Sequence, residues 1–519
     1  MTPQNIDKPL STQFILILAI ISVATSSLLF LLNGYSGIGL RDEGFLWYGS
    51  QRVIAGEIPI KDFMAYDPLR YFWSATWMAY IGDGGIISLR ASVAAFQSIG
   101  FFSALFLIYK HNPQSNRLQI ILTILILAAW MFPRHKLFDI SISIILVAIL
   151  SYLIEKPCFK RYFISGFVIG MAAGFGKNHG VYGAWGLLVT LAYLTIFDFK
   201  LEKLTKNIGY SIAGGFIGFS PILVLSVFDP DFFTAFWDGI IFLFKIKATN
   251  HPLPIPWPWL VEAERLPWSI AIRYVLIGTA FVLLVIASVI GLIYPLILKL
   301  KQTPLPPQIV ASLFMILPYT HFATSRADIA HLAQGIYPLL ICIFISIGQL
   351  KTTYKLAISS LLLISSLSVM LPAQPFWQAK QQGNWTTVSI LDDDLLLPPR
   401  AEAQINLFQN LEREFAPNGQ AFLAIPFLPG AYAVLERKSP IWEIYALAEH
   451  RNDDFQKLEV NRIENADPEF IVILDVNIDG RDELRFMNSR PIIRDYIMEN
   501  FTPNNDFDAP PQYKIYTKK

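Results

Sequence analysis

The sequence predicts a mainly α-helical protein that crosses a membrane many times and carries a soluble α/β domain at its C-terminal end. Of its 519 residues, 54% are hydrophobic and 16% are charged, whereas average soluble domains carry about 25% charged residues. Largely uncharged apolar stretches of about 20 residues, which can cross a hydrocarbon core of roughly 30 Å, recur as far as Leu371. This composition excludes an ordinary soluble enzyme and a disordered chain.

Charge divides the chain into two parts. Residues 1–371 contain 26 Lys and Arg against 17 Asp and Glu, net +9, whereas residues 372–519 contain 15 against 23, net −8. We therefore expect a transmembrane region over residues 1–371 and a separate acidic domain over residues 372–519. Membrane lipid is an expected partner, and nucleic acid is not.

About eleven membrane-spanning helices are expected. No small-residue cleavage site follows the first apolar stretch, so this stretch is expected to be a retained signal anchor. Two long connections, residues 34–85 and 229–270, form a first and a second outer loop. The expected spans are residues 13–33, 86–109, 118–133, 137–154, 162–176, 179–197, 207–228, 271–298, 307–322, 331–350 and 356–371.

The cations of the short loops predict the orientation, because cytoplasmic loops hold an excess of Lys and Arg. One set of alternate loops contains twelve cations, and the opposite set contains only Arg134, Lys136, Lys177 and Arg326. The N-terminus is therefore expected in the cytoplasm. Both long loops and the C-terminal domain are expected on the non-cytoplasmic face of a plasma (inner) membrane.

The first outer loop is predicted to contain two short helices. Apolar residues between Leu46 and Ile54 recur at helical spacing, and Gly56 ends this helix. Asp67 followed by Pro68 marks a second start, since an N-cap and a proline at the first helical position favour it. Both helices are expected to lie along the membrane surface.

The C-terminal domain is predicted from alternating helix and strand patterns. It contains neither a Gly-rich phosphate loop nor metal-ligand spacing, and the two cysteines of the chain, Cys158 and Cys342, cannot form a disulfide framework. The expected elements are helices near residues 405–415 and 491–501 and strands at 420–426, 469–476 and 513–517.

Asp42 and Glu43 are the first candidates for chemistry. A carboxylate just beyond the first span, at the start of a surface helix, is placed to act as a general base between a lipid-borne substrate and an acceptor from water. The alternative is that Asp42 only caps the helix, for which Asp is a favoured residue.

The segment from Asp42 to Tyr71 resembles the first outer loop of the GT-C glycosyltransferases, in particular the branch of protein mannosyltransferases and aminoarabinose transferases. The shared features are an acidic pair, a Gly-x-x-Pro turn, an Asp soon after it, and a Pro and an aromatic residue that open the next helix. In this sequence they are Asp42, Glu43, Gly56, Pro59, Asp62, Pro68 and Tyr71.

This resemblance implies an enzyme that takes a sugar from a polyprenyl-phosphate donor. Asp42 would be the base that deprotonates the acceptor, which is an exported glycan, lipid or protein, and Glu43 would support it. Substrate contacts are expected from three places in the chain, the first outer loop, the second outer loop and the segment before the tenth span. The residues are Asp62, Tyr66, Asp67, His251, Trp257, Asp328 and His331.

A departing polyprenyl phosphate requires cations at the outer membrane face. Lys177, Arg326 and Arg134 are the candidates, because outer-face cations run against the usual charge bias. The alternative for each is a side chain that reaches to the interface without a functional role.

Histidines and a proline-rich segment leave further possibilities open. His135, His179, His251 and His331 would form a divalent metal site only if they converge; otherwise each is an ordinary core or interface residue. Residues 250–268 contain five prolines and three tryptophans and cannot form a continuous helix. This segment either covers a lipid-binding groove or forms an aromatic belt at the interface.

We therefore expect an inverting GT-C type transferase that acts on the outer leaflet. One rival is a transporter or flippase of lipid-linked saccharide, for which mid-membrane charges and repeated halves would be expected. A second rival is a non-catalytic assembly factor, which would not need the Asp42 loop. The sugar, the acceptor and any metal or other cofactor are not identified by the sequence.

Overall fold

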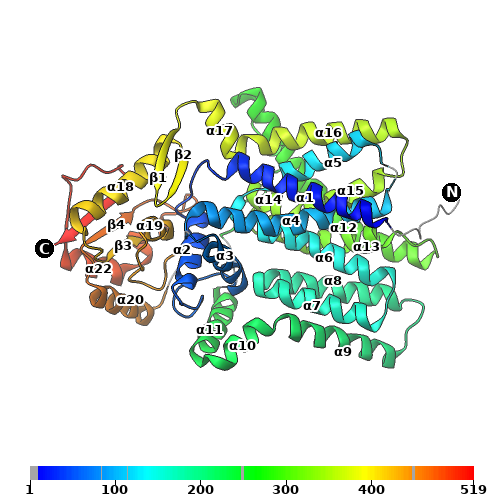
Figure 1. The fold of residues 1–519 in the computed structure, drawn as a ribbon, viewed down its shortest axis with the longest axis horizontal. Helices are drawn as coiled ribbons and strands as arrows, with labels where there is room; N and C mark the ends of the chain where they lie inside the picture. The colour runs from blue at the N-terminus through cyan, green and yellow to red at the C-terminus, as the bar shows by residue number, and fades with distance from the viewer. Residues whose placement is uncertain (1–9, 83, 114, 247–250, 447–450) are drawn as a thin grey trace. The chain divides into compact units, whose positions relative to one another are not determined.

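The computed structural model describes residues 10–82, 84–113, 115–246, 251–446 and 451–519, and it is mainly helical, as predicted (Figure 1). Its residues form two compact units. The first consists of Met1–Leu31, Val93–Phe228 and Lys247–Trp377, and the second of Leu32–Ser92, Asp229–Ile246 and Gln378–Lys519. The first outer loop therefore folds together with the C-terminal region.

The first unit is made of apolar helices. In chain order they are α1 (Thr12–Asn33), α4 (Ile86–His111), α5 (Arg117–Ala129), η1 (Arg134–Lys136), α6 (Leu137–Glu155), α7 (Phe159–Phe175), α8 (Lys177–Thr195), α9 (Leu201–Gly218), α10 (Ser220–Phe228), η2 (Pro258–Leu260), η3 (Ala263–Arg265), α12 (Trp268–Leu300), α13 (Pro307–Ser325), α14 (Ile329–Gly335), α15 (Tyr337–Ile347), α16 (Thr352–Met370) and η4 (Leu371–Ala373). The first residues of α4 and the last two of α1 belong to the second unit.

The count of about eleven spans is not confirmed. Within the described residues, five helical segments are long and apolar enough to cross a membrane: α1, α4, η1 with α6, α12, and α16 with η4. Two bent pairs, α9 with α10 (57°) and α14 with α15 (51°), raise this number to seven. Several expected spans are short, since α5 has 13 residues and α7 has 17.

Small residues explain how α7 and α9 pack. A Cβ atom added at Gly166 or Gly170 of α7, or at Gly214 or Gly218 of α9, would lie 1.9–2.2 Å from a backbone oxygen of the other helix. Only glycine permits this approach, and both pairs have the small-xxx-small spacing that brings helices together in lipid.

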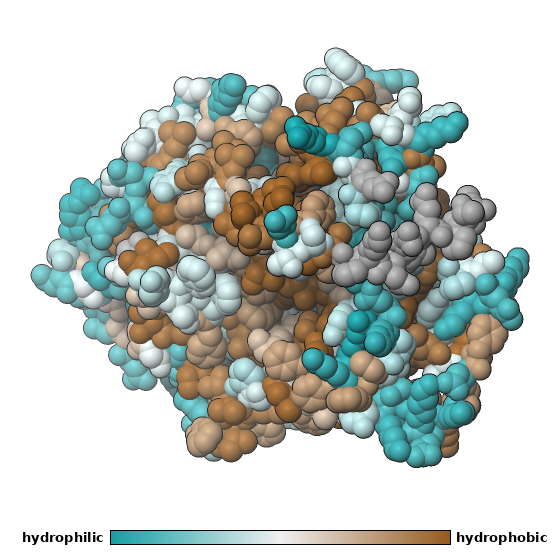
Figure 2. All heavy atoms as spheres, turned by 45° about the vertical axis from the view of Figure 1, so that its right-hand side comes forward, coloured by the Kyte–Doolittle hydropathy of each residue, from teal (hydrophilic) through white to brown (hydrophobic). Residues whose placement is uncertain are grey.

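Large apolar side chains stay exposed on the helices of the first unit. Leu16 and Ile20 of α1, Ile290 of α12 and Ile364 of α16 are examples, and apolar side chains form broad brown areas in Figure 2. Exposed apolar surface on this scale is what a lipid bilayer covers, so these faces fit a multi-pass membrane protein.

A four-stranded sheet forms the centre of the C-terminal part of the second unit. Its strand order is β3-β4-β6-β5; β3 and β4 are parallel, and β6 is antiparallel to β4 and β5. β3 and β4 are buried along their whole length, which explains their continuous apolar sequences. The strands are β3 (Phe422–Ile425), β4 (Phe470–Leu474), β5 (Phe501–Pro503) and β6 (Tyr513–Lys518).

Helices complete this domain. Ile463 of α20 and Ile497 of α22 share an apolar core with Ile471 of β4, and Phe408 of α18 lies beside Phe422 of β3. The expected helices and strands of the domain are thus confirmed. The helices are α17 (Pro375–Gln382), α18 (Pro399–Phe415), α19 (Pro429–Val434), α20 (Asp453–Ala466), η5 (Asp482–Leu484), α21 (Phe486–Ser489) and α22 (Pro491–Asn500).

Three further pieces of the second unit come from the first outer loop, the second outer loop and an antiparallel hairpin. The two helices predicted in the first outer loop are present. We expected α2 to place its apolar residues on the membrane surface, but in the structure they lie inside the protein. Residues 43–50 of α2 are buried, and α2 packs against α3 and α19. The elements are α2 (Asp42–Ile54), α3 (Pro68–Ile81), α11 (Pro230–Ile246), β1 (Thr386–Ile390) and β2 (Asp393–Leu397).

Candidate active site

Asp42 is the first residue of α2, and Arg41 occupies the N-cap position. Arg41 forms no side-chain hydrogen bond that caps the helix. The hydroxyl of Tyr445 donates a hydrogen bond of 2.8 Å to Asp42 Oδ1. A carboxylate in the first turn is also favoured by the helix dipole.

Glu43 forms a buried ion pair with Arg90. Arg90 Nε and Nη2 donate to the two carboxylate oxygens of Glu43, each at 2.9 Å. The same guanidinium donates to the carbonyl oxygens of Gly34 (2.5 Å) and Gly37 (2.7 Å). Glu43 is therefore bound to Arg90, which also holds the chain just before α2.

The other predicted residues of the first outer loop take mainly structural positions. Asp62 Oδ2 accepts a hydrogen bond from Ile58 N at 2.7 Å and closes a turn. Asp67 is at the N-cap position of α3, ahead of Pro68. Tyr66 differs, because its ring packs edge-on against Phe45 with centroids 4.6 Å apart. Phe45 also contacts Tyr445, so Tyr66 lies near the Asp42 pair.

In the first unit, a hydrogen-bonded chain joins three helices. His179 Nε2 lies 3.0 Å from Asp139 Oδ1, and His179 Nδ1 lies 2.8 Å from the hydroxyl of Tyr319. These residues belong to α8, α6 and α13. Both nitrogens of the buried histidine are therefore used within the protein.

These hydrogen bonds join α6, α8 and α13, and each predicted phosphate ligand lies at or next to one end of these helices. Arg134 lies in η1 immediately before α6, Lys177 is the first residue of α8, and Arg326 directly follows α13. The sequence pointed to His179 but not to Asp139 or Tyr319, which lie inside apolar stretches. The signal that could have indicated these two residues is the presence of a polar side chain within an apolar stretch.

Arg326 and three other predicted site residues form one connected group. Arg326 Nε donates to Asp328 Oδ2 at 3.0 Å, and its Nη1 donates to the carbonyl oxygen of His251 at 3.1 Å. His331 Nδ1 lies 2.8 Å from Asp328 Oδ1. Burial raises the pKa of Asp328, but the hydrogen bonds and positive charge of His331, with the charge of Arg326, outweigh it and hold that pKa below its usual range.

The proline-rich segment has no continuous helix in its described part, as predicted; residue 250 lies outside the described residues. The ring of Trp257 is stacked on that of Trp259, with centroids 5.2 Å apart. Pro258 begins one 3-10 turn and Ala263 another. In the ranges that the structure describes, no group of three or more His, Cys, Asp or Glu side chains could hold a metal ion.

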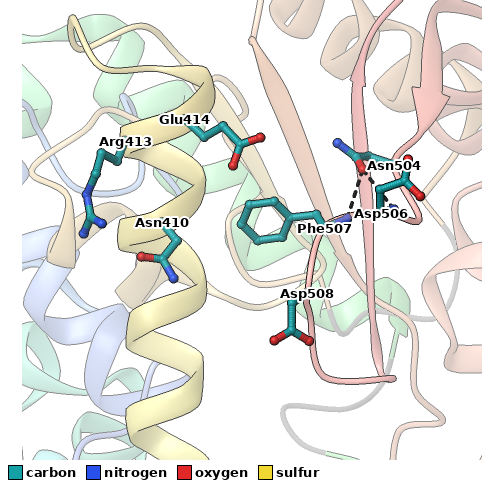
Figure 3. Close-up of a pocket in the computed structure, with 7 residues that line it drawn as sticks. All are labelled: Asn410, Arg413, Glu414, Asn504, Asp506, Phe507 and Asp508. Carbon is teal, nitrogen blue, oxygen red and sulfur yellow. Dashed lines mark hydrogen bonds between the residues drawn. The ribbon is translucent and has the colours of Figure 1, made fainter.

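A polar groove in the C-terminal domain contains none of the predicted site residues. It has a volume of about 670 Å³ and lies between α18 and the chain after β5. In Figure 3, the ring of Phe507 points toward α18, and Asn504 accepts backbone hydrogen bonds from Asp506 and Phe507. The lining residues are Asn410, Arg413, Glu414, Asn504, Asp506, Phe507 and Asp508.

The predicted site residues are divided between the two units. Asp42, Glu43, Asp62, Tyr66 and Asp67 belong to the second unit. Those of the first unit are Arg134, Lys177, His251, Trp257, Arg326, Asp328 and His331.

The predicted resemblance to the GT-C glycosyltransferases is confirmed at the level of the fold, by similarity to solved structures. The fold is similar to the crystal structure of ArnT from Cupriavidus metallidurans bound to undecaprenyl phosphate, with a TM-score of 0.57, 11% identity and 98% of each chain covered. The apo state of the same ArnT gives a TM-score of 0.56 at 12% identity, covering 97% of this chain and 98% of that chain. No protein-family model and no curated protein matches the sequence.

Proposed function

We propose that this protein is a membrane glycosyltransferase that moves a sugar from a polyprenyl-phosphate donor to an exported glycan, lipid or protein. The observation that carries the proposal is Asp42, held by Tyr445 at the start of α2 in a GT-C fold. The similar ArnT was crystallised with undecaprenyl phosphate, which supports a donor of the same chemical class.

In the proposed reaction, Asp42 takes the proton from a hydroxyl or amine of the acceptor. The acceptor atom forms a bond to the anomeric carbon as the bond from that carbon to the phosphate oxygen breaks. The electron pair of the broken bond leaves with the polyprenyl phosphate, and the configuration at the anomeric carbon inverts. Glu43 and Arg90 hold the backbone that precedes the base.

The leaving phosphate gains negative charge, so this step is assisted by cations and hydrogen-bond donors. Lys177 is proposed for this role because it is the first residue of α8, where the positive end of the helix dipole adds to its charge. Arg326 is proposed because its guanidinium is oriented by Asp328 and His251 yet is partly exposed. Arg134, which precedes α6, is the third cation.

A flippase for lipid-linked saccharide is the second candidate, and one observation favours it. Transporters commonly use interrupted helices, and two helix pairs of the first unit are bent by 57° and 51°. Flipping would not require a base, so the Asp42 carboxylate separates the two candidates.

The decisive experiment compares the wild-type protein with Asp42→Asn. The assay uses a panel of undecaprenyl-phosphate-linked hexoses and pentoses, labelled in the sugar, with membrane extract as the acceptor. An amide cannot take the proton, so transfer should fall by a factor on the order of 10²–10⁴. Full transfer by a folded Asp42→Asn protein would falsify the proposed base, whereas no transfer by the folded wild-type protein would favour the flippase.

We further propose that the N-terminus is cytoplasmic and that residues 372–519 are on the opposite face, from the loop charges alone. Reporter fusions after Thr353 and after Gln374 should report opposite compartments, with the first in the cytoplasm. Activity of both reporters in one compartment would contradict this orientation.

A further inference from the structure

Residues 441–446 form an irregular segment of the C-terminal part of the second unit that lies against the first outer loop. Met64 N donates to the carbonyl oxygen of Trp442 at 3.0 Å. The indole Nε1 of Trp442 donates in turn to the carbonyl oxygen of Ile60 at 2.9 Å. This pair of hydrogen bonds fixes the start of the segment to the chain between α2 and α3.

Glu443 fixes the same segment from inside the domain. Its side chain is 3% exposed and forms ion pairs with Arg490 at 3.0 Å and with Arg451 at 2.6 Å. Removing one partner of a buried ion pair leaves an uncompensated charge. The segment therefore cannot shift without separating these charges.

Tyr445 is the residue that this segment directs at Asp42. Its ring is buried beside Phe45 of α2 and Phe427, with centroids 5.1 and 6.2 Å away, and its hydroxyl donates to Asp42 Oδ1 at 2.8 Å. Burial, followed by the negative charge of Asp42, raises the pKa of Tyr445 well above its usual range. The phenol therefore stays protonated and acts as a donor.

We propose that Tyr445 is a positioning residue through which the C-terminal domain orients the Asp42 carboxylate. This inference rests on the proposed function, in which Asp42 is the base. The hydrogen bond restricts rotation of the carboxylate and favours its charged form, which is the form that can accept a proton. Arg41 and Tyr66 are the other ionisable groups that influence Tyr445. The C-terminal domain is then part of the active site.

The test compares Tyr445→Phe with a matched control, Tyr48→Phe. Tyr48 is also buried, and its hydroxyl joins the first outer loop to the same domain by accepting from Ser439 N at 3.0 Å. Turnover and its pH dependence are measured with the panel of undecaprenyl-phosphate-linked hexoses and pentoses, with folded protein quantified in parallel.

Tyr445→Phe should lower kcat by about 10- to 100-fold, as expected for a hydrogen bond to a charged group, with little change in the KM for the donor. Because the charged carboxylate loses a donor, the acidic limb of the pH–rate profile should move to higher pH. Tyr48→Phe should keep the wild-type kcat and pH profile. Equal behaviour of the two variants would overturn the inference.

A second substitution covers the case in which Tyr445→Phe does not fold. Replacing Tyr445 with 3-fluorotyrosine keeps the hydroxyl and makes it a stronger donor, so the acidic limb should move to lower pH. An unchanged limb would overturn the inference. Asp42→Asn, assayed alongside, separates the two hypotheses. Active Asp42→Asn contradicts the base itself, whereas inactive Asp42→Asn with a wild-type profile for Tyr445→Phe contradicts only the positioning role.

Discussion

Charged groups are held differently around Asp42 in the second unit and around Arg326 in the first. The Arg90 and Glu43 side chains beside Asp42 are 2% and 6% exposed and use several hydrogen bonds. Arg326 and Asp328 are 25% and 29% exposed. The first arrangement is fixed by burial, whereas the second leaves part of each charge accessible.

The difference fits the tasks proposed for the two regions. A general base acts only when its carboxylate is held in one orientation toward the reacting group. A cation that receives a lipid phosphate must instead remain open to a ligand that arrives and leaves. We therefore expect substitutions near Asp42 to affect folding strongly, and substitutions near Arg326 to affect turnover in a folded protein.

The largest effect on stability is expected for Arg90→Met. Removing Arg90 leaves the Glu43 carboxylate buried without its partner, which typically costs about 3–5 kcal/mol. The measurement is the yield and thermal denaturation of the protein in detergent.

Arg52→Met is the matched control for that experiment. Arg52 pairs with Glu57 at 2.8 Å, but Glu57 keeps Lys438 at 2.7 Å, and the Arg52 side chain is 19% exposed. Its loss should cost under about 1 kcal/mol. Similar denaturation of the two variants would show that the buried pair is not what fixes the loop before α2.

For Lys177→Met and Arg326→Met we expect a smaller effect, which falls on turnover and not on stability. Loss of a charge-assisted contact to the leaving phosphate should raise the barrier by about 2–4 kcal/mol, or roughly 30- to 1000-fold in turnover. Folding should change little, since Arg326 is partly exposed. The assay is sugar transfer together with thermal denaturation.

Arg265→Met provides the control for these cations. Arg265 lies in the second outer loop; its side chain is 79% exposed and pairs with Glu262, which is 64% exposed. Its replacement should leave turnover at the wild-type level. Wild-type turnover in Lys177→Met and Arg326→Met as well would contradict a role for either residue in binding the phosphate. The region around Asp42 and the region around Arg326 would then differ only in their contribution to stability.

The parts of the fold that local sequence patterns specify were predicted. The helix after Asp42 and the buried strand at Phe470–Leu474 follow from periodicity. The α11 helix and the β1–β2 hairpin were missed. α11 was merged into a loop because it directly follows an apolar span, and β2 was missed because its sequence, DDLLL, does not alternate in polarity although its burial does.

The candidate site was predicted only where its residues are close in sequence. Asp42 and the Arg326 to His331 segment were proposed as site residues because their polar groups lie within a few positions of one another, and their roles stay predictions. Tyr445 was not proposed, since 403 positions separate it from Asp42 and no local pattern indicates that contact. Asp139 and Arg90 were missed for a related reason: each looks like an isolated polar residue until its partner on another helix is known.

The joining of the first outer loop to the end of the chain has a consequence for biosynthesis. Gly37 N donates to the carbonyl oxygen of Leu396, and Gly430 N donates to that of Leu40, both at 2.8 Å. During translation, Gly37 and Leu40 are made several hundred residues before Leu396 and Gly430. The nascent first outer loop therefore lacks these hydrogen-bond partners until that later part of the chain has been synthesised. A prematurely terminated chain would reach the membrane but would never acquire an ordered Asp42.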